Sequence, residues 1–167
     1  EETLLSLQEN LAKCEKQLSE YLETKKKAFP RFYFVSVTDL LDILSKGGQS
    51  PHKIVHHMSK LFQAVDTLIF KTDENGNKTN EVIGLVSREG EELKFVTPIT
   101  LEGKVEDYLN KLLVHIRENL REILATAVKQ YTEIPREKWL TIFPAQIVLI
   151  GSQIYYTMDV HAAFEGL

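Results

Sequence analysis

The first 27 residues carry a regular apolar seam. Apolar side chains recur at alternating spacings of three and four residues, at Leu4, Leu7, Leu11, Cys14, Leu18 and Tyr21. Polar residues fill most of the remaining positions, so the pattern predicts one long helix over residues 3–27 with a narrow apolar face. Such a face serves either a coiled coil with another chain or packing against the chain's own domain. Three heptads are few for an independent coiled coil, which favours packing within the domain.

An aromatic segment follows this helix. Pro30 disfavours helical geometry at the residue before it, so the helix is predicted to end near Ala28. Four aromatic side chains then stand within six residues, namely Phe29, Phe32, Tyr33 and Phe34. Aromatic side chains bury large areas, and we expect this segment, with Pro30 and Arg31, to anchor the fold by packing in the core. A ligand pocket needs converging polar groups, and the segment offers none that are evident.

Two short helices are predicted next. Ser36 and Asp39 form a capping-box pattern ahead of an apolar run, and Gly47-Gly48 ends that helix. Ser50 and Pro51 supply an N-cap and a favoured first position for the second helix. Its expected buried face consists of Ile54, Val55, Met58, Leu61 and Phe62. The two helices, joined by a tight turn, predict an αα-hairpin.

The periodicity changes after Val65. Three short apolar segments rich in β-formers are strand candidates, at residues 67–70, 82–86 and 93–96. Asp73–Asn77 is a strong turn signal, and Gly90 is placed to supply a positive φ between the last two strands. The sequence therefore predicts a small antiparallel hairpin or meander at about residues 67–97. A sheet of this size must pack on the helices to be stable.

Helical periodicity returns near Gly103. It predicts a helix of about 25 residues and about 40 Å in length. Pro135 and Trp139 mark a short segment, with Trp139 expected as a further core anchor. Pro144 is expected to begin a final helix that runs through Met158.

These elements predict a mainly α fold of the α+β class, in which long and short helices pack around a small sheet. The expected organisation is a helical subdomain over residues 1–66, the sheet over 67–101 and a second helical subdomain over 102–167. All three parts are expected to form one compact fragment of a larger chain. Long helices and the lack of flexible spacers predict a rigid unit whose long helices lie side by side.

Composition and charge narrow the range of partners. The chain has 24 acidic and 20 basic residues, interleaved without a basic stripe, so a nucleic-acid partner has little support. No apolar stretch approaches the ~20 residues of a membrane span. The one local charge run, Lys25-Lys26-Lys27, is read as a solvated helix end rather than a site for an acidic partner. The single cysteine, Cys14, excludes an internal disulfide framework and suits a reducing compartment.

Candidate chemistry is sparse. The sequence lacks a Gly-rich phosphate loop and a Gly-x-Ser-x-Gly nucleophile turn. His52 and His56 share a helical face in the way that zinc-binding pairs do, with His57 beside them, and Asp39 or Asp42 could approach. We expect these histidines to be surface residues without a metal. Hairpin carboxylates such as Glu91 are expected to be solvated. The sequence thus predicts a non-catalytic segment with no cofactor and no metal.

Several motifs in this chain resemble the linker of dynein heavy chains. They are Phe29-Pro30-Arg31-Phe32-Tyr33-Phe34-Val35-Ser36 with Asp39–Ser45, Ser87–Glu91, Val105–Leu109, and Phe143–Gln146 with Gln153–Thr157. The motifs follow the family's order and cover nearly the whole chain. The form Phe-Pro-Arg-Phe is more similar to axonemal than to cytoplasmic dyneins.

The resemblance implies the C-terminal half of the linker, a lever that arches over the AAA+ ring and changes shape as the ring turns over nucleotide. It implies contacts with the ring of the same heavy chain and with the rest of the linker and the tail, and with microtubules only through the full motor. It also implies location in the cytoplasm and cytoskeleton, in the axoneme of a cilium or flagellum. Two alternatives stay open: a helical adaptor that pairs through the N-terminal heptads, and a metalloenzyme around His52 and His56.

Overall fold

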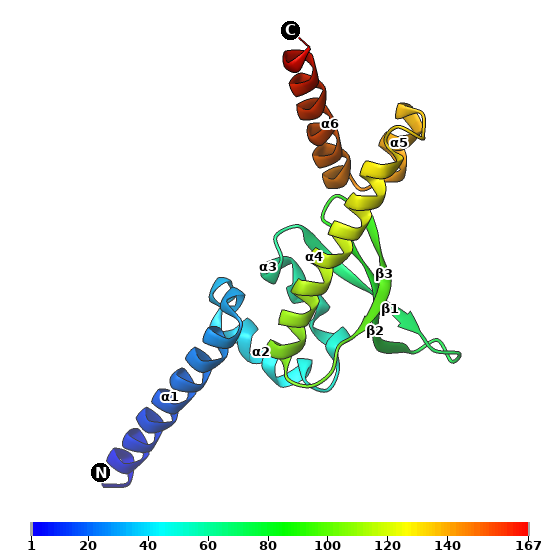
Figure 1. Ribbon diagram of the computed structural model, residues 1–167. Coiled ribbons are helices and arrows are strands. Elements are labelled where there is room, and N and C mark those ends of the chain that lie inside the picture. Colours follow the sequence, from blue (N-terminus) through cyan, green and yellow to red (C-terminus); the bar gives the residue numbers. More distant parts are fainter. Residues whose placement is uncertain (1, 167) are drawn as a thin grey trace.

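The computed structural model describes residues 2–166 and has the expected mainly α fold with a small antiparallel sheet (Figure 1). The elements are α1 (Glu2–Ala28), η1 (Pro30–Phe34), α2 (Val37–Gly47), η2 (Pro51–His57), α3 (Met58–Leu61), β1 (Val65–Thr72), β2 (Lys78–Ser87), β3 (Glu92–Thr100), α4 (Val105–Gln130), α5 (Arg136–Ile142) and α6 (Ala145–Glu165). The labels η1 and η2 denote 3-10 helices. The α+β prediction is confirmed.

The sheet has the order β1-β2-β3, and both pairs of neighbours are antiparallel. Gly76 and Gly90 take positive φ angles of 80° and 83° in the two connecting turns, as the hairpin signals required. Gly84 lies in the central strand, where an added Cβ would meet the carbonyl oxygen of Leu93 at 2.6 Å. Only a glycine therefore lets β3 approach β2 this closely.

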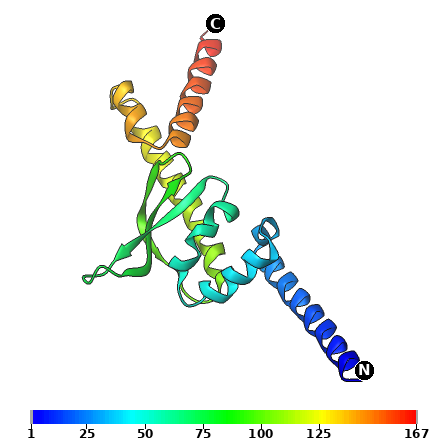
Figure 2. The same cartoon turned by 180° about the vertical axis from the view of Figure 1, so that it is seen from behind.

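A central body forms where α4 lies against the sheet and the short helices pack at one end of it (Figures 1 and 2). Its core joins the end of α1, the short helices, the inner face of the sheet and the first turns of α4. The buried Asn119 side chain of α4 accepts a hydrogen bond from the Val96 backbone N–H at 2.7 Å. His115, one turn earlier, contacts the Thr97 carbonyl at 2.8 Å. Through these contacts α4 covers part of strand β3, which lies at an edge of the sheet.

The position of helix α1 differs from the expectation that its apolar seam packs within the domain. The helix projects from the central body (Figure 1), and its seam residues Leu4, Leu7, Leu11, Leu18 and Tyr21 are exposed. Only the last turns are anchored, through the buried Leu22, which lies next to the seam in the sequence. Packing of the seam on the chain's own domain is therefore wrong for the described residues. The expectation that the long helices lie side by side is wrong for the same reason, because α1 meets α4 only near one end.

A second, smaller core joins α4 to the last two helices. Ala127, Trp139 and Ile147 are buried together, and Phe143 packs at their edge. Beyond these contacts α6 projects from the body (Figures 1 and 2), and its Leu149, Tyr156 and Phe164 side chains are exposed. The structure thus has a packed centre with one helix leaving it at each end.

Three local predictions also need correction. Tyr33 and Phe34 are exposed, Phe34 by 78%, because a 3-10 turn directs only part of the aromatic run inward. The second short helix is a 3-10 helix followed by one α-helical turn, and the Ser50 side chain makes no cap hydrogen bond. By contrast, the Ser36 hydroxyl accepts from the Asp39 backbone N–H at 3.1 Å, so this cap is confirmed.

Candidate functional site

Two joints connect the projecting helices to the central body, and they are the candidate functional site of a chain with this shape. The α1 joint consists of the end of α1, the aromatic segment and the first turns of α4. The α6 joint consists of the end of α4, α5 and the start of α6. The α1 joint is held by side chains from elements far apart in the sequence, whereas the α6 joint brings together three consecutive helices.

A charged pair lies at the centre of the α1 joint. Lys25 Nζ donates to Glu106 Oε1 at 2.5 Å, and the Glu106 side chain is only 7% exposed. The Asn110 side-chain amide, one turn further along α4, donates to the Ala28 carbonyl at 3.0 Å and so covers the last turn of α1. The interpretation of Lys25 as a solvated helix end is therefore wrong. A lysine near a helix C-terminus also complements the helix dipole.

The aromatic segment completes the α1 joint. Phe29 and Phe32 are buried and meet edge to face, with ring centroids 5.0 Å apart. Arg31 donates to the Leu61 carbonyl at 2.9 Å. The exposed Tyr33 hydroxyl donates to Glu23 at 3.1 Å, which ties the segment back to α1. The proposed anchoring role of these residues stays a prediction, and stability measurements test it below.

The Lys25–Glu106 pair predicts a specific acid sensitivity. Burial raises the pKa of Glu106. The hydrogen bond from Lys25 and the positive charge of Lys25 outweigh this effect, so the pKa lies below its usual value of 4.5. The pKa of Glu106 is therefore lower in the folded than in the unfolded state. The pair stabilises the fold fully at a pH above the usual pKa, and this contribution is lost as the pH falls through the folded-state pKa. We expect Glu106→Gln to flatten the fall in unfolding free energy below about pH 4.5, as measured by urea denaturation across pH.

A charge-removal variant gives the matching test at neutral pH. Lys25→Met leaves the carboxylate of Glu106 without its partner in a largely buried place, which costs about 1–3 kcal/mol. Lys26→Met is the control, because Lys26 pairs with the more exposed Glu23 on its own helix. Equal effects of the two substitutions would show that the pair does not hold the joint.

Trp139 is the centre of the α6 joint. Its side chain is fully buried, and its indole N–H donates to the Ala127 carbonyl in α4 at 2.9 Å. Gly151 lets α6 approach the indole, since an added Cβ would lie 3.0 Å from two of its ring atoms. Tyr155 of α6 stacks on Tyr131 with centroids 3.8 Å apart and donates to the Val128 carbonyl at 2.6 Å. The expected burial of Trp139 is thus observed.

A hairpin carboxylate links the sheet to α6. Glu91 Oε1, in the turn between β2 and β3, accepts from the Ala145 backbone N–H at 2.9 Å. Ala145 is the first residue of α6, so the carboxylate caps a helix end that has no intrahelical acceptor. Glu91 is exposed, as expected for a turn carboxylate, but it also makes this contact with α6. The sequence carries no local signal for it, because the partners are 54 residues apart.

The Glu91 cap predicts local loosening on mutation. Glu91→Ala removes the charged cap of α6, at a cost of about 1 kcal/mol. Hydrogen exchange should quicken at the first amides of α6 and stay unchanged in β1. Glu89→Ala serves as the control, because Glu89 lies in the same exposed turn and makes none of the described hydrogen bonds. Unchanged exchange in α6 would contradict a coupling between the sheet and this helix.

The histidines and the cysteine lie apart from both joints. His57 is buried rather than on the surface, and its ring nitrogen lies 3.1 Å from Asp42 Oδ2. His56 is exposed beside it, whereas His52 faces Phe70 with centroids 6.5 Å apart. The expectation that all three are surface histidines is therefore wrong for His57. Cys14 is exposed on α1.

Comparison with known proteins identifies the chain. Residues 1–127, from α1 into the end of α4, match the family model described as "Dynein heavy chain, N-terminal region 2". This chain belongs to the dynein heavy chain family. The resemblance seen in the motifs is thereby confirmed at the level of the family, and the matched part is described as its N-terminal region 2. None of the helices described for residues 2–166 is long and apolar enough to cross a membrane.

Relatives cover the rest of the chain, including α5 and α6. It is 46% identical over 164 residues to "Dynein beta chain, ciliary" of Tripneustes gratilla, and 43% identical over 166 residues to "Dynein axonemal heavy chain 9" of Homo sapiens. It is 41% identical over 167 residues to "Dynein beta chain, flagellar outer arm" of Chlamydomonas reinhardtii. These alignments cover 98%, 99% and 100% of the chain but only 4% of each relative. The chain is therefore similar to axonemal dynein heavy chains over one short segment of their length.

Proposed function

We propose that this chain is a force-transmitting segment of the linker of an axonemal dynein heavy chain. In this proposal it couples nucleotide-driven changes in the AAA+ ring to movement of the tail along microtubules. The observation that carries the proposal is the shape (Figure 1): a helix leaves each end of a packed centre, and specific side-chain contacts hold both joints. Such an arrangement suits an element that passes on displacement without bending.

The contacts support one route for the transmitted force in this proposal. A pull on α1 reaches α4 through the Lys25–Glu106 pair and the Asn110 cap. Helix α4 has 26 residues and so spans about 39 Å, which carries the load from one joint to the other. Trp139 and Tyr155 pass it to α6, and Glu91 braces the start of that helix against the sheet.

The proposal also covers partners and place. The three sequence units, residues 1–66, 67–101 and 102–167, act as one mechanical part of a longer chain. Its partners are the AAA+ ring of the same heavy chain, the rest of the linker and the tail. Microtubules are reached only through the full motor, in a cilium or flagellum. The segment itself performs no catalysis, and ATP turnover belongs to the ring.

The decisive experiment uses a complete axonemal dynein heavy chain that contains this segment. A Gly-Ser-Gly-Ser insertion after Thr132, between α4 and α5, makes the α6 joint flexible. A matched insertion after Gly48, in the exposed turn between α2 and η2, leaves both joints intact. We expect the joint insertion to slow microtubule gliding several-fold while ATP turnover continues, and the control to glide normally. Normal gliding with the joint insertion would refute the lever role.

A second candidate function rests on the exposed seam of α1. A helical adaptor would use Leu4, Leu7 and Leu11 to pair with a helix of another chain, as heptad residues do. Deletion of residues 1–20 spares Leu22 and the α1 joint, so the centre stays folded. Loss of self-association or partner binding on this deletion, together with unimpaired gliding of the motor, would favour the adaptor over the lever.

A further inference from the structure

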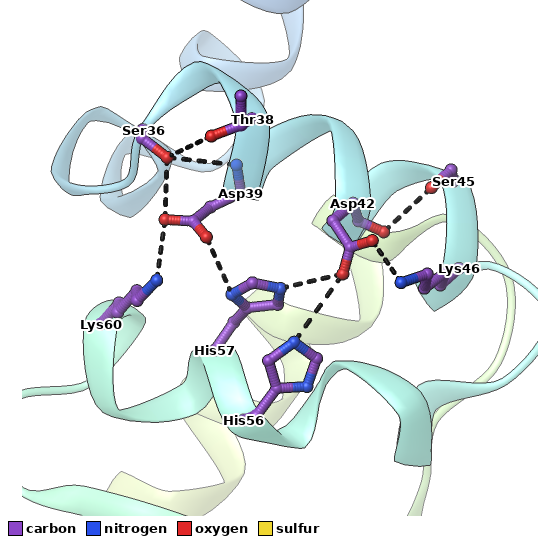
Figure 3. Close-up of polar contacts among 9 residues, drawn as sticks. All are labelled: Ser36, Thr38, Asp39, Asp42, Ser45, Lys46, His56, His57 and Lys60. Atoms are coloured by element: carbon purple, nitrogen blue, oxygen red, sulfur yellow. Dashed lines mark hydrogen bonds and ion pairs between the residues drawn. The ribbon is translucent and has the colours of Figure 1, made fainter.

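A compact group of imidazole and carboxylate side chains joins α2 to η2 (Figure 3). The buried His57 Nε2 lies 3.1 Å from Asp42 Oδ2, and the exposed His56 Nε2 lies 3.7 Å from the same oxygen. One potential ligand atom from each residue lies within 4.8 Å of the others. Two helical elements thus direct three ligand-type atoms at one point.

The other nitrogen of His57 supplies an independent observation. His57 is 3% exposed, and its Nδ1 is buried without a hydrogen-bond partner. The nearest carboxylate oxygen is Asp39 Oδ1, at 3.6 Å. A histidine that binds a metal through one nitrogen commonly directs the other N–H at a carboxylate, which fixes its tautomer and orientation. Asp39 lies on the Nδ1 side of His57, in the position of such an outer carboxylate (Figure 3).

We propose that Asp42, His56 and His57 bind one divalent transition-metal ion of the zinc class, with Asp39 as the outer carboxylate behind His57. Zinc binds histidine nitrogen and carboxylate oxygen at about 2.0–2.2 Å, which places tetrahedral ligands about 3.3–3.6 Å apart. The observed separations of 3.1 Å and 3.7 Å bracket that spacing. A water molecule completes the four ligands, as in zinc sites with three protein ligands.

The surrounding charges fit this role. The Lys46 ammonium pairs with Asp42 Oδ1, and Oδ2 is left facing the two histidines. Lys60 holds Asp39 in the same way, through Oδ2 at 2.8 Å, so that Oδ1 faces His57.

The ligand set also selects the metal. Two imidazoles and one carboxylate suit zinc and its transition-metal neighbours, whereas magnesium and calcium prefer oxygen ligands throughout. Asp42 lies on α2 and the two histidines lie on η2, so a bound ion would clamp these elements together. The site would therefore stabilise the contact between α2 and η2 in the central body.

Zinc and cobalt titration of the purified chain tests the proposal. Cys14→Ser is the background, because an exposed thiol is a soft ligand that binds zinc by itself. Competition with a chromophoric chelator should give one zinc ion per chain, and cobalt should give the absorption bands of a tetrahedral site. Zinc should also raise the melting temperature by several degrees, because a ligand that binds only the folded state stabilises it.

Matched variants decide which residues bind the ion. His56→Ala removes an exposed ligand without touching the core and should weaken zinc binding at least tenfold. Asp39→Asn should weaken it about 10–100-fold, the usual effect of losing an outer-shell partner. His161→Ala, an exposed histidine on α6, should change nothing. Absence of one-to-one binding, or equal losses in His56→Ala and His161→Ala, would overturn the proposal and leave only adventitious surface binding.

Discussion

Replacement of Trp139 by alanine is expected to cost about 3–5 kcal/mol of unfolding free energy, the range for truncating a buried aromatic side chain. The indole is fully buried, donates to the Ala127 carbonyl and packs against Gly151, so its loss opens a cavity between α4 and α6. The loss of structure should begin at the α6 joint. The buried residues of the α6 joint form a core of their own, which meets the larger core at the half-buried Leu120 and Ile123. Hydrogen exchange should therefore rise throughout α6 before it rises in β2.

Two controls separate packing from the hydrogen bond. Trp139→Phe keeps most of the apolar contact and loses the N–H donor, and should cost about 1–2 kcal/mol. Leu140→Ala alters the neighbouring, 44% exposed side chain and should cost much less than Trp139→Ala. Circular dichroism is the signal to follow during denaturation, because Trp139 is the only tryptophan in the sequence. Equal costs for Trp139→Ala and Leu140→Ala would mean that the α6 joint does not depend on the indole.

Replacement of Phe32 by alanine is the second large expected effect, again about 3–5 kcal/mol. Phe32 is fully buried and meets Phe29 edge to face, and Phe29 in turn lies 6.4 Å from the Phe62 ring. Truncation at this position therefore disrupts the contact between the end of α1 and the larger core. Urea denaturation measures the change.

The same short helix contains a matched control. Phe34 has the same side chain two residues later but is 78% exposed, so Phe34→Ala should change the unfolding free energy by less than about 0.5 kcal/mol. A large loss of stability with Phe34→Ala, or a small one with Phe32→Ala, would contradict the arrangement of the aromatic segment described above.

Local signals in the sequence were sufficient to predict most elements. The Ser36 cap, the glycines at positions 76 and 90, and the periodicity after Gly103 act over a few residues, and each corresponds to an observed boundary or turn. The same signals cannot show which apolar face is covered. The seam of α1 has the pattern of a buried helix face, yet the described residues leave it exposed.

Two contacts at the joints connect residues that are distant in the sequence. Glu91 and Ala145 are 54 residues apart, and Lys25 and Glu106 are 81 apart, so no local pattern predicts either bond. His57 and Asp42 are only 15 apart, and their helices were predicted to be adjacent. Even so, the turn between them decides which histidine is buried. In the aromatic segment, side-chain type predicted burial, but the 3-10 geometry decided that Phe32 is buried and Phe34 is not.

The central claim of the proposal concerns residues 22–158, from Leu22, which anchors α1, to about one turn beyond Tyr155 of α6. These residues are proposed to move as one rigid unit that carries force between its two joints. Structures of the complete heavy chain in two nucleotide states test it most directly. Superposition of residues 22–158 should leave a Cα deviation of about 1 Å or less, as for rigid partners, while the segment as a whole changes position against the ring. A repacked Trp139 joint, or a changed angle between α4 and α6, would contradict the claim.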